Sequence, residues 1–489
     1  MAISVFDSIN DLEVINNDEA LMAAGNNCTG LGFPPREILK PQNTSAVQAL
    51  VQMAAHHNLA LYPSSCGRNW GLGSRALPQA NAILVDFSAM NNITHYDPDN
   101  GQVSLQPGVS FAQLSDFLKH QGSNWQASVI GGPSTASVLA NALERGDGIG
   151  RQGDRATSIN NIQAVLGNGR IVTSGHNNSA AHWHSYPLGP DTQSLFIQSN
   201  FGLVCGADLQ LAPKAVDTLF AMLDVNNSEA WHTLIDSCKA MLREQLVEPR
   251  AISFWNGAKR QARIKPCKQW PQESLTQSQL SAWSATFFVQ TFHPNMMSAK
   301  MAMLRPLLGD LNTRLQVFND RDKQGETIPS QATGTPSDDN LHSLYWQKDS
   351  VPTSKNLDPD ADQCGCLWLC LAAPFEAHQL NKGLTELDNI MQRKGFNPNL
   401  GFQVADHKAV HLFVAIIYDR DQEDQQNHAM ACHEEILNYC NDIQWPLIRA
   451  GLPSMQQVKA LPANRRQWLQ EIKQVSDPKM IIAPGRYIF

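Results

Sequence analysis

The chain has 489 residues, of which 37 are lysine or arginine and 45 are aspartate or glutamate, for a formal net charge of −8. With 42% apolar and 17% charged residues it has the composition of a folded protein, which counts against disorder and against a basic nucleic-acid-binding surface. The first twenty residues resemble no signal peptide, and no apolar run is long enough to cross a membrane, so we expect a cytoplasmic protein that binds neither membranes nor nucleic acid.

Helical and strand-like segments alternate up to about Pro213, as is typical of an α/β domain. The first helix is predicted because apolar residues recur at helical spacing behind a Thr/Ser cap at Thr44. The predicted elements are, in chain order, this helix, strands over 59–62, 82–87 and 102–106, a helix over 110–119, and a strand, turn and strand over about 162–173.

From about residue 215 to 442 the pattern changes to longer amphipathic helices and separated strands, interrupted by a polar stretch over 320–340, which predicts a second domain. The ten cysteines lack the paired CxxC spacing of a zinc site, and we expect them to stay reduced. The histidines at 56–57 and at 176, 182 and 184 also lack ligand spacing, so no metal site is predicted.

Three glycine-rich segments lie in the first domain. The first follows a predicted strand and contains Gly67, Gly71 and Gly73 together with Arg68. Glycines let backbone N–H groups converge on one point, and an arginine adds positive charge, which suits a pyrophosphate. The second begins at Gly131-Gly132, and the third covers 188–202. Each segment alone could be a surface turn, but three in one domain favour an extended, phosphate-bearing cofactor.

Seven segments, in order along nearly the whole chain, resemble the flavoprotein family of vanillyl-alcohol oxidase and 4-cresol dehydrogenase (p-cresol methylhydroxylase, PCMH). The segments are Gly67–Gly73, Asn141–Gly146, Gly153-Asp154, Leu188–Gly202, Leu344–Lys348, Asp358–Gly365 and Ile482–Arg486. The resemblance implies an α+β, two-domain PCMH-type FAD-binding fold with an α/β substrate cap domain. The FAD domain would be residues 1–213, completed by 447–489, and the cap would be residues 214–446.

The resemblance also implies the reaction. A small, aromatic or conjugated alcohol or alkyl carbon would give a hydride to flavin N5, and O2 or an external acceptor would then take the electrons. The protein would be a homodimer. The residues expected to hold FAD are Ser65, Cys66, Gly67, Arg68, Asn69, Gly71, Gly73, Gly131, Gly132, Ser134, Asn141, Glu144, Arg145, Gly146, Cys366 and Arg486.

Cys366 stands where family members that tether FAD covalently carry a histidine or tyrosine. A thiolate could form such a link. The alternative, which we prefer, is a small buried residue beside non-covalent FAD. Arg486 would stabilise the anionic reduced flavin.

Three residues are expected to serve catalysis. Asp154 falls where the family has a carboxylate near flavin N5, although it could instead be a loop aspartate that caps a turn. Arg449 aligns with an arginine that stabilises a substrate phenolate, and His411 would reach the cavity unless it is a packed core histidine. The residues expected to contact substrate are Leu72, Trp368, Phe413, Ile448 and Arg449.

Leu72 and Ile448 stand where phenol-oxidising members of the family carry tyrosines. Without those hydroxyls the selection of a para-hydroxyl is weakened, so Arg449 is also available for a carboxylate or an enol. Oxidation of a hydroxy acid or an aliphatic alcohol therefore stays open. So does a non-catalytic flavin-binding subunit.

Overall fold

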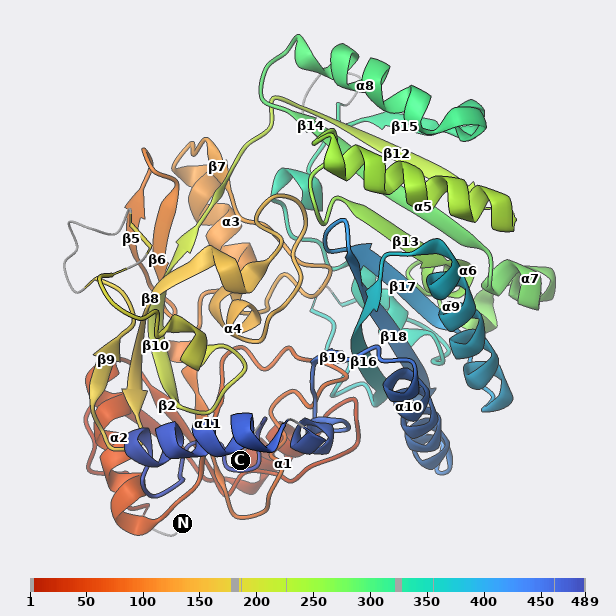
Figure 1. The fold of residues 1–489 in the computed structure, drawn as a ribbon. Helices are drawn as coiled ribbons and strands as arrows, with labels where there is room; N and C mark the ends of the chain where they lie inside the picture. Colours follow the sequence, from red (N-terminus) through yellow and green to blue (C-terminus); the bar gives the residue numbers. More distant parts are fainter. Residues whose placement is uncertain are drawn as a thin grey trace.

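A computed structural model describes residues 4–176, 184–185, 187–225, 227–321, 328–354, 356–460 and 462–487. His182 and part of the polar stretch over 320–340 lie outside these residues. The chain forms two halves, one red to yellow-green and one green to blue, and the last helix returns to the first half (Figure 1). No helix in the described ranges has the length and apolar character needed to cross a membrane.

The first half contains a four-stranded sheet in the order β1-β2-β4-β3, in which only β1 is antiparallel to its neighbour. Helix α2 packs on it through Val47, Leu50 and Val51, and the Asn43 side chain caps this helix by accepting from the N–H of Ala46. The bounds are β1 Leu12–Ile15, α1 Asp18–Gly25, β2 Glu37–Pro41, α2 Thr44–His57, β3 Leu61–Ser64 and β4 Ile83–Asp86.

A second, antiparallel sheet of five strands has the order β5-β6-β10-β8-β9, with a small pair β11-β7 beside it. Helices α3 and α4 share its hydrophobic core through Leu114 and Leu139. The bounds are β5 Ile93–Asp97, β6 Gln102–Leu105, α3 Phe111–His120, β7 Trp125–Gln126, α4 Val138–Leu143, β8 Ile159–Leu166, β9 Ile171–Thr173, β10 Gly202–Gln210 and β11 Ala212–Pro213.

The second half is built on an antiparallel sheet of eight strands in the order β15-β12-β14-β13-β17-β18-β16-β19. Its strands are β12 Asp217–Val225, β13 Ile252–Asn256, β14 Trp283–Thr291, β15 Gln316–Asn319, β16 Cys364–Pro374, β17 Asn399–Val404, β18 Ala409–Asp419 and β19 Leu447–Arg449. The helices of this half are α5 Ser228–Arg243, α6 Gly257–Ala262, α7 Gln277–Leu280, α8 Met296–Leu307, α9 Ala377–Arg393 and α10 Gln425–Asp442.

The two faces of β16 have different partners. Leu367, Leu369 and Leu371 join the core formed with α5, α8, α9 and α10. Trp368 and Cys370, which alternate with these leucines, line a cavity on the other face. This alternation directs one face of the sheet toward the first half.

The chain returns to the first half after β19. The domain boundary predicted at residue 447 falls at the start of this strand, which pairs with β16 at the sheet edge. Helix α11, Ala463–Ser476, then packs against the second sheet through Leu469, and Ile482 forms a parallel bridge with Leu61 of β3. Residues more than four hundred positions apart therefore complete one sheet.

Candidate active site

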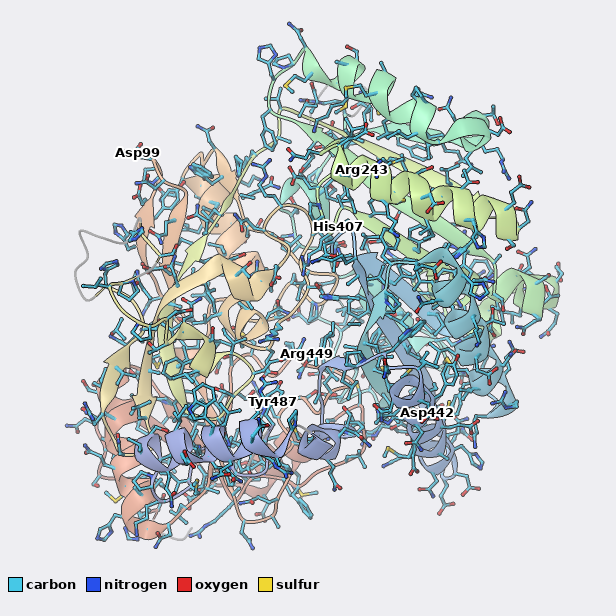
Figure 2. All side chains as sticks on the ribbon, viewed as in Figure 1. Asp99, Arg243, His407, Asp442, Arg449 and Tyr487 are labelled. Atoms are coloured by element: carbon cyan, nitrogen blue, oxygen red, sulfur yellow. The ribbon has the colours of Figure 1, made fainter. Side chains whose placement is uncertain are left out.

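A cavity of about 460 Å³ is lined by residues of both halves. Figure 2 shows Arg449 in this region between the two halves. The predicted site residues that line the cavity are Ser65, Cys66, Gly67, Arg68, Asn69, Leu72, Gly131, Gly132, Asn141, Glu144, Trp368, Phe413, Arg449 and Arg486. Fourteen residues chosen from distant parts of the sequence thus share one space.

The other predicted residues do not line this cavity: Gly71, Gly73, Ser134, Arg145, Gly146, Asp154, Cys366, His411 and Ile448. Several of them support its walls. The backbone N–H and the hydroxyl of Ser134 donate to Asp338, and the carbonyl of Ile448 accepts from Gln198 Nε2 at 2.7 Å.

The loop after β3 packs directly on β16. Gly71 has φ +78°, and a Cβ there would lie 2.3 Å from Cδ1 of Trp368 and 2.9 Å from Sγ of Cys366. The Trp368 N–H donates to the Gly71 carbonyl at 3.2 Å. Cys366 is thus sealed behind this contact, and burial raises the pKa of its thiol, which keeps it protonated.

Arg449 presents a guanidinium that forms no ion pair with any carboxylate in the described ranges. Its Nη2 donates to Asn69 Oδ1 at 3.0 Å, and its Nε is buried without a hydrogen-bond partner. The backbone of Arg449 is fixed opposite Cys370 in the pairing of β19 with β16. The fold therefore holds a cation at the cavity wall with hydrogen-bonding capacity to spare.

Glu144, at the end of α4, is neutralised by the C-terminal segment. Arg486 Nη2 lies 2.6 Å from one carboxylate oxygen, and the Tyr487 hydroxyl donates to the other. Both Glu144 and Arg486 line the cavity. The cation predicted near the flavin is therefore an ion pair, with the charge of Arg486 largely compensated in the structure.

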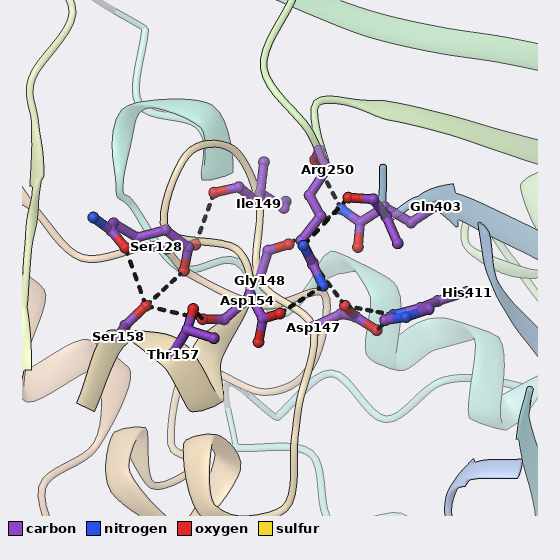
Figure 3. A network of polar contacts seen from close by, with 12 residues as sticks. Ser128, Asp147, Gly148, Ile149, Asp154, Thr157, Ser158, Arg250, Gln403 and His411 are labelled. Atoms are coloured by element: carbon purple, nitrogen blue, oxygen red, sulfur yellow. Dashed lines mark hydrogen bonds and ion pairs between the residues drawn. The ribbon is translucent and has the colours of Figure 1, made fainter. Parts of the chain in front are cut away.

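Asp147 was not predicted, yet it lines the cavity and lies at the centre of a polar network (Figure 3). Its Oδ2 lies 2.7 Å from His411 Nδ1, and its Oδ1 accepts from Arg250 Nε at 3.0 Å. Arg250 Nη2 also donates to Asp154 Oδ2 at 3.3 Å. The structure thus joins the two predicted residues His411 and Asp154 through a pair that the prediction omitted.

Asp154 occupies the outer end of this network. Its side chain is 47% exposed, against 9% for Asp147. A clue to Asp147 was present in the sequence, because it lies between Gly146 and Gly148 in the second glycine-rich segment, where no side chain on either flank competes for space.

Lys259 on α6 is another residue that the prediction omitted. Its Nζ lies 5.0 Å from the ring centroid of Trp368 and 5.6 Å from that of Trp255, and all three residues line the cavity. Burial lowers the pKa of Lys259 to about 8. Nothing in the sequence marked this lysine, because a lysine in a short helix is usually solvated.

The residues present fit a polar, aromatic cofactor. Several residues that line the cavity carry a buried polar atom without a hydrogen-bond partner among the described residues, among them Trp70 Nε1, Asn141 Oδ1 and Arg449 Nε. Such atoms are costly unless a ligand pairs with them. The loops that contain Gly67 and Gly131 lie along the same cavity, as an extended dinucleotide requires. In the described part of the chain, no cluster of histidine, cysteine and acidic residues could hold a metal ion.

Comparisons with known proteins agree with this fit. The profile of a family described as an FAD binding domain matches residues 35–175. Over its full length the chain is 27% identical to 1'-carboxy-chondrochloren decarboxylase of Chondromyces crocatus, covering 97% of that protein. It is 20% identical to the 4-cresol dehydrogenase flavoprotein subunit of Pseudomonas putida, over 92% of this chain and 87% of that subunit.

Two solved structures share the fold. The chain superposes on p-cresol methylhydroxylase with substrate bound at a TM-score of 0.86 and 19% identity, over 97% of this chain and 93% of the other. It superposes on a 4-ethylphenol oxidase from Gulosibacter chungangensis at a TM-score of 0.86 and 18% identity, over 97% and 94%.

Proposed function

Because the chain is an FAD-dependent oxidoreductase with the fold of the PCMH-type flavoproteins, we propose that it removes a hydride from a small aromatic or conjugated alcohol or alkyl carbon. FAD supplies the hydride acceptor, and the protein supplies binding, orientation and proton transfer. The observation that carries the proposal is one cavity in which the unpaired guanidinium of Arg449 and the carboxylate of Asp147 share walls with aromatic rings. These rings are Trp255, Trp368, Phe402 and Phe413.

Arg449 binds the oxyanion of the substrate. A guanidinium beside a phenol or an enol lowers the pKa of that group by favouring its anion, which makes an adjacent carbon a better hydride donor. Leu72 offers only apolar surface beside it, and the Ile448 carbonyl is occupied by Gln198. Because neither Leu72 nor Ile448 has a hydroxyl group, the protein then selects its substrate by charge and shape.

Asp147 takes the proton of the substrate. Two contacts hold its carboxylate in place, from His411 and from Arg250, so it faces the cavity in one orientation. Asp154 acts as a positioning residue through its contact with Arg250. We prefer this role to the expected direct contact of Asp154 with flavin N5. This order of roles is supported because Asp154 does not line the cavity and its side chain is 47% exposed.

The test compares Asp147→Asn with Asp154→Asn during anaerobic reduction of the flavin by 4-alkylphenols and 4-hydroxybenzyl alcohols. Asp147→Asn should slow reduction about a hundredfold or more, because proton transfer is lost. Asp154→Asn should cost less than about tenfold, because it breaks a half-exposed ion pair. Only Asp147→Asn should remove a proton-transfer step from the pH profile of the reduction rate.

Two results would contradict this assignment. If Asp147→Asn reduces the flavin at the normal rate with FAD bound, Asp147 is not the proton acceptor. If no substrate of a broad panel bleaches the flavin of the unaltered protein, a non-catalytic flavin-binding subunit becomes the better description.

A second candidate function is oxidation of an acid, either a hydroxy acid or an acid that loses CO2. Its support is the full-length similarity to a protein named as a decarboxylase, together with the unpaired Arg449. Release of CO2 from 4-hydroxyphenyl-substituted acids, measured alongside flavin bleaching, distinguishes this function from simple dehydrogenation.

We also infer non-covalent FAD, a cytoplasmic location, a homodimer, and O2 or an external electron acceptor. Cys366 supports the first point, because its buried, protonated thiol is a poor nucleophile. All ten cysteines are free, in agreement with a reducing compartment. Acid precipitation should leave the yellow flavin in the supernatant, and light scattering measures the oligomeric state. Reoxidation of reduced flavin in air distinguishes O2 from another acceptor.

A further inference from the structure

Lys259 is held in position by the start of its helix. Asn256 caps α6, with its Oδ1 accepting from the Lys259 N–H at 3.0 Å and its Nδ2 donating to the Pro398 carbonyl. The side chain then extends into the cavity, where its Nζ lies over the rings of Trp255 and Trp368. Within the described part of the chain, this ammonium donates a single hydrogen bond, to Asn399 Oδ1 at 3.5 Å.

The sheet beneath Lys259 has space for its aliphatic part. Gly401 lies in β17, paired with Trp255 of β13 and Phe413 of β18, where a glycine weakens a strand. A Cβ at Gly401 would lie 2.6 Å from Cδ and 2.9 Å from Cε of Lys259. A central strand therefore lacks a side chain at the point where the lysine crosses it.

The ammonium group lacks an anion. No carboxylate in the described ranges pairs with Lys259, and the titratable groups nearest to it on β16 are the thiols of Cys366 and Cys370. Burial raises the pKa of Cys366 and raises that of Cys370 to about 11, so both are neutral at pH 7. On its own helix end, Arg263 adds only positive charge and pairs with Asp339.

A half-buried cation without an anion is costly, and two indole rings offset only part of that cost. The cost falls when a ligand brings the anion. Arg449 is paired opposite Cys370 on β16, and Lys259 lies over Trp368, which is on the same face of that strand two positions earlier, so the two cations lie along one wall. A substrate that spans this wall can meet both.

We propose that Lys259 binds a carboxylate of the substrate, so that the protein acts on an aromatic acid whose opposite end faces Arg449 and Asp147. The inference rests on the proposed function, because it takes this cavity as the substrate site. It adds the class of substrate and the residue that selects it.

The test uses the holoenzyme and pairs of probes that differ only in charge: 4-hydroxyphenylacetate with 4-hydroxyphenylacetamide, and 4-hydroxycinnamate with its amide. Binding is followed at pH 7, without oxygen, by the perturbation of the flavin spectrum. The unaltered protein should bind at least one acid about tenfold to a hundredfold more tightly than its amide. Lys259→Met should lose this preference, and Lys259→Arg should keep it.

Lys265→Met is the matched control. Its ammonium also lies over an indole, 4.6 Å from the ring of Trp270, but it does not line the cavity. This variant should keep the preference for the acid. If Lys259→Met loses FAD or stability, Gly401→Ala provides a second variant, because its methyl group displaces the lysine stem and should also abolish the preference.

Equal binding of acids and amides by the unaltered protein, or the same preference in Lys259→Met, would overturn the proposal. The proposed function fails separately. If acids bind more tightly than amides but no substrate bleaches the flavin, the carboxylate site at Lys259 is supported and the proposed oxidation is wrong. If neutral phenols bleach the flavin and acids bind no better, the oxidation stands and the assignment of Lys259 is wrong.

Discussion

His433 and His428 occupy the same helix, α10, but differ in access to water. His433 is 2% exposed, and its Nε2 has no hydrogen-bond partner. Burial lowers the pKa of His433 to about 4, below the ordinary value of 6.5. His428 is exposed. Protonation of His433 therefore stabilises the unfolded state relative to the folded state.

This difference predicts an acid-sensitive stability. Below pH 6.5 His433 binds a proton in the unfolded state but stays neutral in the folded state. The free energy of unfolding therefore falls as the pH drops from 6.5 toward 4. At pH 5 the loss is about 2 kcal/mol. In His433→Leu, the free energy of unfolding should fall by about that amount less between pH 8 and pH 5 than in the unaltered protein, as measured by urea denaturation. His428→Leu should show no such pH dependence, and a similar gain from both variants would contradict the argument.

Where a motif fixed the position, the sequence identified residues that share the cavity, and their roles stay predictions. Asn69, Asn141 and Glu144 lie in recognisable segments and line the cavity. Lys259 could not be found, because its environment is made by Trp368 and Gly401, which only the sheet brings near it. Asp147 and Asp154 are seven positions apart in one loop, and only the fold of that loop decides which faces the cavity.

At the scale of elements, the end of α11 carries a buried ion pair whose two residues also bind backbone groups of neighbouring segments. Lys473 Nζ lies 2.8 Å from Asp477 Oδ2, with both side chains at most 1% exposed. Nζ also donates to the carbonyls of Asn200 and Ile482, and Asp477 accepts from the N–H of Ile482 at 2.8 Å. This network fixes the backbone that lines one side of the cavity.

Removing one charge of this pair should be worse than removing both. Lys473→Met should lower the free energy of unfolding by about 3–5 kcal/mol, because Asp477 is left buried and unpaired. The double variant Lys473→Met/Asp477→Asn should lose clearly less than the sum of the single losses. A urea-denaturation double-mutant cycle measures this coupling, and additive losses would show that the pair is not coupled.

Elements with local sequence patterns were predicted closely. The helix expected from Thr44 is α2, Thr44–His57, and the helix expected over 110–119 is α3, Phe111–His120. The expected strands at 82–87 and 102–106 match β4 and β6. The order of the strands could not be predicted from the sequence, because the place of β4 between β2 and β3 depends on pairings between distant segments.

At the scale of the whole molecule, the cavity lies at the interface between the two halves. Its walls combine loops of the first half with β16, β17 and β18 of the second. A ligand bound there stabilises the folded protein by an amount that grows with its free concentration, about 2.7 kcal/mol at a hundred times its Kd.

Removal of FAD should therefore lower the melting temperature, and added FAD should restore it in a concentration-dependent way. Differential scanning calorimetry of the apoprotein, with and without FAD, measures the effect. Added riboflavin, which lacks the pyrophosphate, should restore less. A melting temperature unaffected by FAD would show that the cofactor does not bridge the halves.

The family resemblance was predictable because its motifs are spread over both halves. The predicted FAD cofactor and PCMH-type fold are confirmed by the matching domain profile and by two structures of the same fold. Substrate choice was not predictable, since it depends on side chains such as Lys259, which lies outside the shared segments, and Leu72, which replaces the tyrosine of phenol-oxidising members.

The bridge between Leu61 and Ile482 has a consequence for biosynthesis. Strand β3 leaves the ribosome early, but its last partner is made about 420 residues later, which takes about 20 to 80 seconds at ordinary translation rates. During that interval β3 presents an unpaired edge, and the cradle around Arg486 does not yet exist. Cofactor loading must then wait for synthesis of the segment that contains Arg486, and nascent chains paused before residue 482 should depend on chaperones.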